Sequence, residues 1–325
     1  MLSYRVKVLL VSAVAALWTG AAVSADSVTP IDVLEFAPGF QMMTVDGVNV
    51  VVQTGPEGTV VVNAGPASSA AALLAAIKQH TSTPIRYVLN TNADPAVVGG
   101  AATLAAAGES MMQDLPGQNV RAIAMNVATQ NAQTALASEP GFDLAALPTQ
   151  LFSRPVYSFY LNDEPIQVIA TPAGRSNADA VVMFRKSNVV VAGNIFDNSR
   201  FPVIDLAHGG SIQGELDALN KLLNEMVFTS TPTVTDGGGT LVIPVRGAVS
   251  DQADLLGYRN MVGIIRDRIR ELIDQGKSLA QVQAARPTQG YDSRYGSSSG
   301  RWTTHDFVEA VYKSLKAEQG ARRKR

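Results

Sequence analysis

A polar loop behind a short apolar run carries the residues of this chain that are best placed to do chemistry. Residues 85–89 are mostly β-branched and apolar and predict a strand, which ends at the polar residues 90–94. The loop continues through a Gly pair into the small-residue segment 101–107. Asp94 is the side chain of this loop that could bind a metal or act as a catalytic base.

The elements ahead of the loop predict where it lies in the fold. Residues 40–45 and 48–53 predict two strands joined at an Asp-Gly turn, and the β-branched run 59–62 predicts a strand buried on both faces. A helix over residues 67–80 then leads back to the strand before the loop. This order resembles a βαβ unit, and it puts the loop at the carboxyl end of a strand, where open α/β sheets usually have their sites.

The second half predicts another group of strands followed by helices. A short strand and a helix are expected in the intervening segment, at residues 121–124 and 126–137. The further strands are expected at residues 157–160, 166–170, 181–184, 189–192 and 241–243. Helices are expected at residues 251–275 and 304–315, and the capping-box pattern at 278–281 predicts a further short helix. A surface loop is expected at residues 289–300. Composition and periodicity predict the class α/β or α+β.

The loop resembles the metal-binding turn of the metallo-β-lactamase superfamily, a strand that ends in Thr-His-x-His-x-Asp-His-x-x-Gly. Thr91 and Gly100 match the two ends of that motif. Three His positions and one Asp position of the motif are occupied by Asn92, Asp94, Val97 and Ala96. The resemblance covers residues 40–315 and implies one domain with the four-layer αββα sandwich of that superfamily.

Three later segments resemble the remaining ligand segments of the superfamily. Arg175 stands at the His of Pro-x-Gly-His-Thr, Asn194 at the Asp of a strand ending Gly-Asp, and Arg246 at the His of Pro-Gly-His-Gly. The early strand that usually ends in Asp-x-Gly ends in Asn63-Ala64-Gly65. Guanidinium has no lone pair for zinc, so we expect no metal ligands and no zinc cofactor.

Other catalytic sets find little support in the sequence. The chain has no cysteine, and its histidines are His80, His208 and His305, none of which has metal-ligand spacing to another. The Gly-x-Ser-x-Gly at residues 296–300 lies in a Ser-rich loop without the strand that a nucleophile elbow needs. His208 and Ser211 are close in sequence, which by itself makes no triad.

The N-terminus predicts export. Residues 1–25 combine Arg5 and Lys7, an apolar run and a small-residue cleavage site, which is typical of a signal peptide. Removal of these two cations lowers the formal charge from −2 to −4, and removal of the basic end Arg322-Arg323-Lys324-Arg325 lowers it to −8. We therefore expect a bacterial periplasmic or secreted protein with no membrane span after cleavage and no nucleic-acid partner. Residues 26–315 form the predicted domain and 316–325 a basic tail.

The function predicted from these residues is binding without zinc hydrolysis. On the resemblance, Asn92, Asp94, Arg175, Asn194 and Arg246 converge in a vestigial site with net positive charge. We expect Arg175 or Arg246 to pair with Asp94, either as a structural network or to leave a guanidinium for a small anionic ligand. The partner could also be an envelope protein. The alternatives are a divergent hydrolase of lactamase, lactonase or thioesterase type with Asp94 as its candidate catalytic residue, and a scaffold without a ligand.

Overall fold

The computed structural model describes residues 31–111, 124–226 and 239–323. The predicted signal peptide, most of the predicted strand at 121–124 and the last two residues of the basic tail lie outside these ranges. Within them, no helix is both long enough and apolar enough to cross a membrane.

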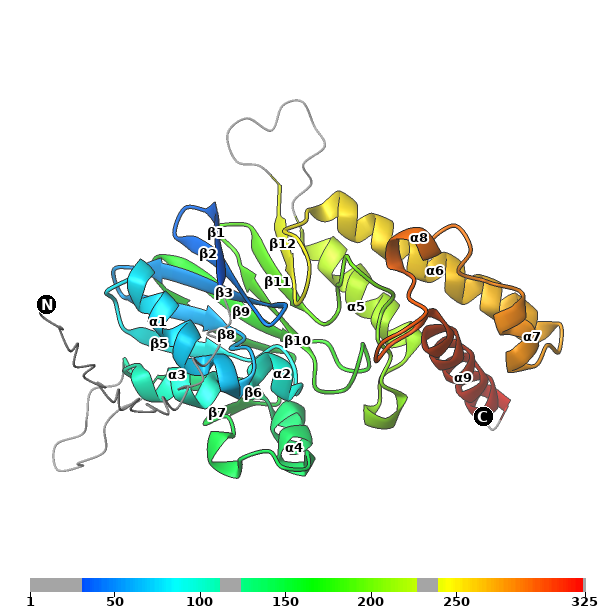
Figure 1. Ribbon diagram of the computed structural model, residues 1–325, viewed down its shortest axis with the longest axis horizontal. Helices are drawn as coiled ribbons and strands as arrows, with labels where there is room; N and C mark the ends of the chain where they lie inside the picture. Colours follow the sequence, from blue (N-terminus) through cyan, green and yellow to red (C-terminus); the bar gives the residue numbers. More distant parts are fainter. Residues whose placement is uncertain (1–30, 112–123, 227–238, 324–325) are drawn as a thin grey trace, which may run out of the picture.

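Two sheets form the centre of the structure (Figure 1). The first has the order β1-β2-β3-β4-β5-β6-β7, antiparallel up to β4 and parallel from β4 to β7. The second has the order β12-β11-β10-β9-β8, in which only β11 and β12 are parallel. The strands are β1 Asp32–Ala37, β2 Phe40–Val45, β3 Val48–Gly55, β4 Gly58–Val62, β5 Ile85–Leu89, β6 Met125–Thr129, β7 Gln150–Phe152, β8 Val156–Leu161, β9 Glu164–Ala170, β10 Ala180–Phe184, β11 Val189–Gly193 and β12 Leu241–Pro244.

Helices cover the outer face of each sheet, so the layers are helix, sheet, sheet, helix. The α-helices are α1 Ala70–His80, α2 Pro95–Val98, α3 Ala101–Ala107, α4 Gln130–Ser138, α5 Ile212–Glu225, α6 Gln252–Asp274, α7 Leu279–Ala284, α8 Asp292–Tyr295 and α9 Thr304–Arg323; the 3-10 turns are η1 Ala67–Ser69, η2 Leu144–Ala146 and η3 Leu206–His208. In Figure 1, α1 and α3 lie at one end of the molecule, and α6 to α9 lie at the other.

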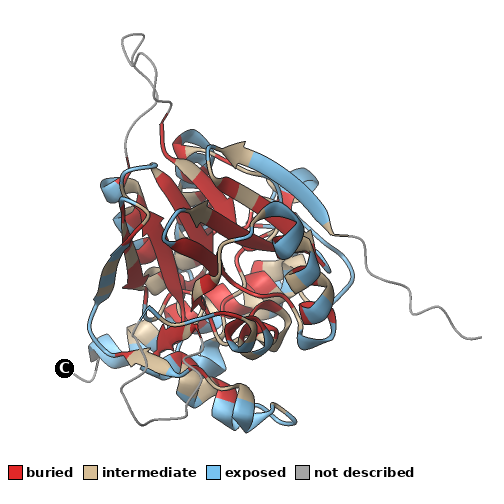
Figure 2. Ribbon diagram, turned by 90° about the vertical axis from the view of Figure 1, so that its left-hand side faces the viewer, coloured by how far each residue is buried: buried red, intermediate tan, exposed pale blue. Residues whose placement is uncertain are grey.

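Three apolar clusters hold these layers together. Leu73 and Leu104 of α1 and α3 pack with valines of the first sheet. The facing sides of the two sheets form a second cluster, in which Phe40 meets Phe184 edge to face. The third packs α5, α6 and α9 on the outer face of the second sheet. Figure 2 shows the result, with buried strands inside and exposure mainly on helices and loops. Burial of this apolar surface is the main term that stabilises the fold.

Backbone contacts join the two sheets at one end. The Ala180 amide donates to the Thr91 carbonyl at 2.7 Å, and the Asn49 amide donates to the Val245 carbonyl at 2.8 Å. Gly193 has a φ of +55°, and a Cβ there would come within 2.9 Å of the Thr91 Cβ. Glycine is therefore needed where β11 ends beside the polar loop.

Several predicted elements are corrected by the structure. Residues 126–129 belong to strand β6, and the helix predicted from 126 begins at Gln130, because the Thr129 hydroxyl caps it by accepting from the Ala132 amide. The predicted loop 289–300 contains α8, whose Tyr295 is buried against Phe201 and Tyr258. The last helix ends at Arg323 and not at residue 315. Strands β1 and β7 and helix α5 were not predicted.

Candidate functional site

The five predicted site residues lie in loops that follow carboxyl ends of strands. Asn92 and Asp94 come after β5, Arg175 after β9, Asn194 directly after β11, and Arg246 after β12. These strand ends meet at the edge where the two sheets are joined, close to Thr91. The fold therefore places the five positions around one region of the molecule.

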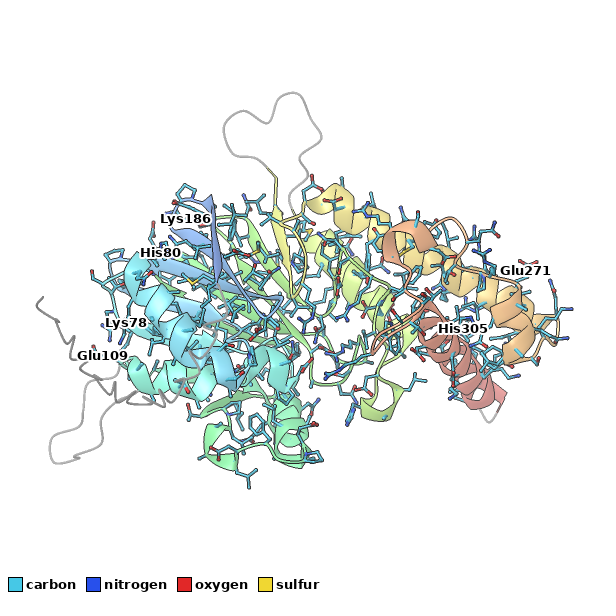
Figure 3. All side chains as sticks on the ribbon, viewed as in Figure 1. Lys78, His80, Glu109, Lys186, Glu271 and His305 are labelled. Carbon is cyan, nitrogen blue, oxygen red and sulfur yellow. The ribbon has the colours of Figure 1, made fainter. Side chains whose placement is uncertain are left out.

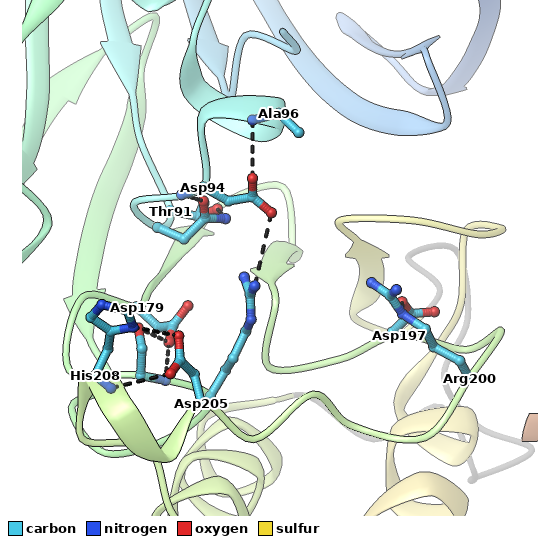
Figure 4. Close-up of polar contacts among 11 residues, drawn as sticks. Thr91, Asp94, Ala96, Asp179, Asp197, Arg200, Asp205 and His208 are labelled. Carbon is cyan, nitrogen blue, oxygen red and sulfur yellow. Dashed lines mark hydrogen bonds and ion pairs between the residues drawn. The ribbon is translucent and has the colours of Figure 1, made fainter. Parts of the chain in front are cut away.

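Asp94 and Arg175 form an ion pair in this region. The Arg175 Nη2 lies 3.9 Å from Oδ2 of Asp94, with the two side chains 23% and 29% exposed (Figure 4). The other Asp94 oxygen accepts from the Ala96 amide at 3.0 Å and caps α2. The carboxylate thus helps to start a helix besides facing a cation. At this distance and exposure, the ion pair itself contributes little to stability.

Asn92 has a local structural role. It is buried, its side-chain oxygen accepts from the Asp94 amide at 2.8 Å, and its amide nitrogen donates to the Thr91 hydroxyl at 3.2 Å. The Thr91 hydroxyl in turn donates to the Asn63 side chain at 2.8 Å. Asn63 and Asn92 therefore hold the backbone of the loop, and their polar atoms are directed inward.

Arg246 does not pair with Asp94. Its Nη1 donates to the Gly47 carbonyl, in the turn between β2 and β3, at 3.1 Å. Burial lowers the pKa of Arg246, and repulsion from Arg200 and Arg175 lowers it further, whereas Asp94 and Asp197 raise it. Within the described part of the chain, Arg246 has no ion pair with a carboxylate.

A pair of buried acids behind Arg175 was not predicted. Asp179 precedes β10 and is 1% exposed, and Glu215 of α5 is fully buried. The Asp179 carboxylate accepts from the amide and the hydroxyl of Ser176 at 2.6 and 2.7 Å. Neither side-chain oxygen of Glu215 has a hydrogen-bond partner in the residues that the structure describes. Glu215 stands at helical spacing from Ile212 and Leu219, so an acid on the apolar stripe of α5 was the signal in the sequence.

The charges of this buried pair are coupled. Burial raises the pKa of Asp179 to about 6, although Arg175, Ser176 and Asn194 act to lower it. Burial raises the pKa of Glu215 well above its ordinary value, Asp179 raises it further, and Arg175 lowers it. Because an isolated buried carboxylate is costly, this burial favours the protonated form of Glu215. Arg175 is therefore shared between a partly exposed acid, Asp94, and two buried ones.

The residues at the ligand positions do not fit zinc. Asp94 offers lone pairs from a carboxylate, but Arg175 and Arg246 offer none, and the polar atoms of Asn92 are directed into the loop. Over residues 31–111, 124–226 and 239–323, no group of three or more His, Cys, Asp or Glu side chains could hold a metal ion.

One of the three histidines lies near Asp94. His208 Nδ1 is 2.7 Å from Asp205 Oδ2, and both residues line a hollow of about 200 Å³ together with Asp94, Arg175 and Glu139 (Figure 4). His80 and His305 lie far from it, near opposite ends of the molecule (Figure 3). The Ser211 hydroxyl caps α5, so it is not paired with His208. Ser297 and Ser299 bond each other in an exposed turn, which has no preceding strand.

Comparison with known proteins identifies the fold. No family model and no curated protein matches the sequence. A metallo-β-lactamase from Pontibacter korlensis superposes with a TM-score of 0.54 at 16% identity, over 72% of this chain and 99% of that chain. TMB-1 matches at 14% identity with a TM-score of 0.52, over 72% of this chain and 97% of that one.

A longer protein matches more of this chain. The stereoselective inverting sec-alkylsulfatase Pisa1 from Pseudomonas sp. superposes with a TM-score of 0.63 at 14% identity, over 87% of this chain. This chain spans only 50% of the length of that enzyme. The four-layer fold predicted from the sequence is confirmed. Identities this low carry the fold and leave the activity open.

Proposed function

The chain has the metallo-β-lactamase fold, and from this premise we propose that it is an exported protein that binds a small anion at Arg246 and Arg175 without zinc-dependent hydrolysis. The observation that carries the proposal is the guanidinium of Arg246. It is partly buried and is repelled by two other guanidinium groups. Among the residues that the structure describes, it bonds only a backbone carbonyl. An anion with two or more oxygens would offer it the charged partner that it lacks.

The balance of charge around Arg246 supports an anion. Four charged groups act on Arg246: the guanidinium groups of Arg175 and Arg200 repel it, and the carboxylates of Asp94 and Asp197 attract it. Arg200 is held by Asp197 at 2.7 Å, and Arg175 by Asp94 at 3.9 Å. Among these five groups the cations outnumber the carboxylates by one, and the further acid that acts on Arg175 is the buried Asp179. We propose carboxylate, sulfate or phosphate as the group bound, and an envelope protein that presents such a group is an equivalent partner.

A second candidate function is hydrolysis without zinc. The hollow that contains Asp94 also contains the Asp205–His208 pair, in which Asp205 orients the ring so that its other nitrogen faces away from the carboxylate. Such a pair could act as a general base on water. This candidate predicts turnover of ester or lactone substrates that is insensitive to a chelator and is lost in His208→Gln.

Metal content tests the absence of zinc. The mature protein is dialysed against zinc, desalted and measured by elemental analysis, then measured again after a chelator. We expect less than stoichiometric zinc and the same melting temperature before and after the chelator. Near-stoichiometric zinc would overturn the metal-free site.

Calorimetric titration with sulfate tests the anion site. We expect saturable binding that weakens at least tenfold in Arg246→Ala, about the effect of one charge-assisted hydrogen bond. Arg185→Ala is the matched control, because Arg185 is a partly exposed arginine that pairs with Glu225 at 2.7 Å away from this region. Equal weakening in both variants, or no sulfate binding in the unmodified protein, would refute the proposal.

A further inference from the structure

Two hollows share no lining residue with the one around Asp94, and neither is used by the proposed function. The larger, the trough, has a volume of about 940 Å³ and lies between α5, α9 and residues 170–173. The smaller, the basic hollow, has about 360 Å³ and lies at the start of α4 beside residues 152–155. Ala170, Pro172 and Lys221 line both, so the two hollows adjoin.

Small residues of both helices line the trough. Gly214 and Ala218 of α5 and Ala317 and Ala321 of α9 all line it, as does Ala173. The positions on each helix are four residues apart, which places them on one face. The two helices are packed together elsewhere through larger apolar residues such as Leu219 and Val311. Here the short side chains leave an apolar channel between the helices.

The basic hollow carries positive charge without a counter-charge. Lys221 and Arg154 line it, none of its lining residues is acidic, and neither cation has an ion pair within the residues that the structure describes. Thr129, Gln130 and Asn131 at the beginning of α4 also line it, so the positive end of that helix dipole faces the same space. The hollow is complementary to an anionic group.

The trough itself is less one-sided in charge. Charged residues of both signs line it: Asp217, which accepts from the Gln213 side chain, Lys313, which pairs with Glu309 at 2.6 Å, and Glu318 and Arg322 of α9. A charged headgroup therefore finds cations without acids only in the basic hollow, whereas the surface of the trough is chiefly apolar. Its size is in the range of sites that enclose small ligands, roughly 300–1,000 Å³.

We propose that the two hollows together bind a single-chain amphiphilic anion of the fatty-acid class, with its carboxylate between Lys221 and Arg154 and its alkyl chain along the trough. Lys221 sits at the junction, where the headgroup meets the chain. Burial of each further methylene strengthens binding about threefold to fourfold, so affinity rises with chain length until the trough is filled.

The experiment is calorimetric titration of the full chain with dodecanoate below its micelle concentration, with octanoate and dodecyltrimethylammonium as comparisons. We expect one dodecanoate per chain, much weaker binding of octanoate, and no saturable binding of the cation. Equal binding of the dodecyl cation and anion would overturn the proposal, because it would indicate adsorption through the chain alone. Absence of saturable dodecanoate binding would also overturn it.

Two variants separate the headgroup site from the trough. Lys221→Glu should weaken dodecanoate binding at least tenfold, and the double variant Ala317→Leu with Ala321→Leu should do so by filling the channel. All three positions are exposed, so the variants should fold. Lys78→Glu and Ala75→Leu, at exposed positions of α1, are the matched controls and should change affinity less than twofold. The proposal fails if test and control variants bind alike.

Discussion

The candidate site has two regions that differ in how far their charged groups are exposed to water: a rim, formed by Asp94 and Arg246, and the pair of buried acids behind it. At the rim, Asp94 and Arg246 are partly exposed and bond backbone groups. Behind it, Asp179 and Glu215 are removed from water. Arg175 acts on both regions. Solvent screens the charges of the rim, so substitutions there should change the free energy of unfolding little. The stability contributed by the buried pair should depend strongly on pH and on the presence of its cation.

The largest expected effect is the pH dependence of stability that the buried pair causes. The folded state raises the pKa of Asp179 from 3.8 to about 6, so it binds this proton more tightly than the unfolded chain does. The contribution of Asp179 to the free energy of unfolding is therefore highest below about pH 4 and is lost as pH rises to about 6, by on the order of 3 kcal/mol. Burial also raises the pKa of Glu215, so this acid adds a loss of stability of the same sign as pH rises.

This prediction is checked by urea unfolding from pH 4 to pH 7. Asp179→Asn should flatten the profile relative to the unmodified protein, and Glu215→Gln should raise stability at neutral pH, since it removes the need to protonate a carboxylate on folding. Asp274→Asn, at an exposed position of α6, is the control and should leave the profile unchanged. A profile of the same slope in Asp179→Asn would show that the pair is not protonated as proposed.

Removal of Arg175 should have the next largest effect. Arg175→Ala leaves the buried Asp179 carboxylate without its cation, so the protein should lose about 2 kcal/mol of stability at neutral pH. The loss should shrink at low pH, where both acids are protonated. Denaturant unfolding at pH 7.5 and pH 4.5 measures the loss of stability at neutral and at low pH. A loss of equal size at both pH values would assign Arg175 a packing role in place of an electrostatic one.

A smaller effect is expected for the other arginine of the rim. Arg246→Ala removes one hydrogen bond to the Gly47 carbonyl at the surface, and the cost should stay below about 1 kcal/mol. The same unfolding measurement tests it. If Arg246→Ala destabilised the protein as much as Arg175→Ala, Arg246 would be a structural member of the network, and its role as a spare cation would be refuted.

Whether an element or a site residue could be predicted from the sequence depended on how local its signal is. Elements with local patterns were predicted because their signals lie within a few residues. Examples are the hairpin at Asp46-Gly47 and the capped helix α6. Edge strand β1 is mostly exposed, so it lacks the apolar pattern of a half-buried strand, although it pairs with the neighbouring β2. The short β7 pairs with β6, from which the helix α4 separates it in the sequence. The ligand positions were found by motif, but Glu215 was missed because helix α5 was not predicted. Its burial beside Asp179 is a property of the packed layers alone.

The smallest effect should come from Asp94. Asp94→Asn keeps an oxygen that can accept from the Ala96 amide, so α2 keeps its cap, and only the ion pair to Arg175 is lost. With both side chains partly exposed and 3.9 Å apart, that pair should contribute less than about 0.5 kcal/mol at low salt and nothing measurable in high salt. Asp94→Ala, which also removes the cap, should cost about 1 kcal/mol at any salt concentration. Denaturant unfolding at low and at high salt concentration separates the contribution of the ion pair from that of the helix cap. A salt-insensitive cost of 2 kcal/mol or more in Asp94→Asn would mean that the rim is as dry as the acid pair behind it, and the two regions would then form one buried network.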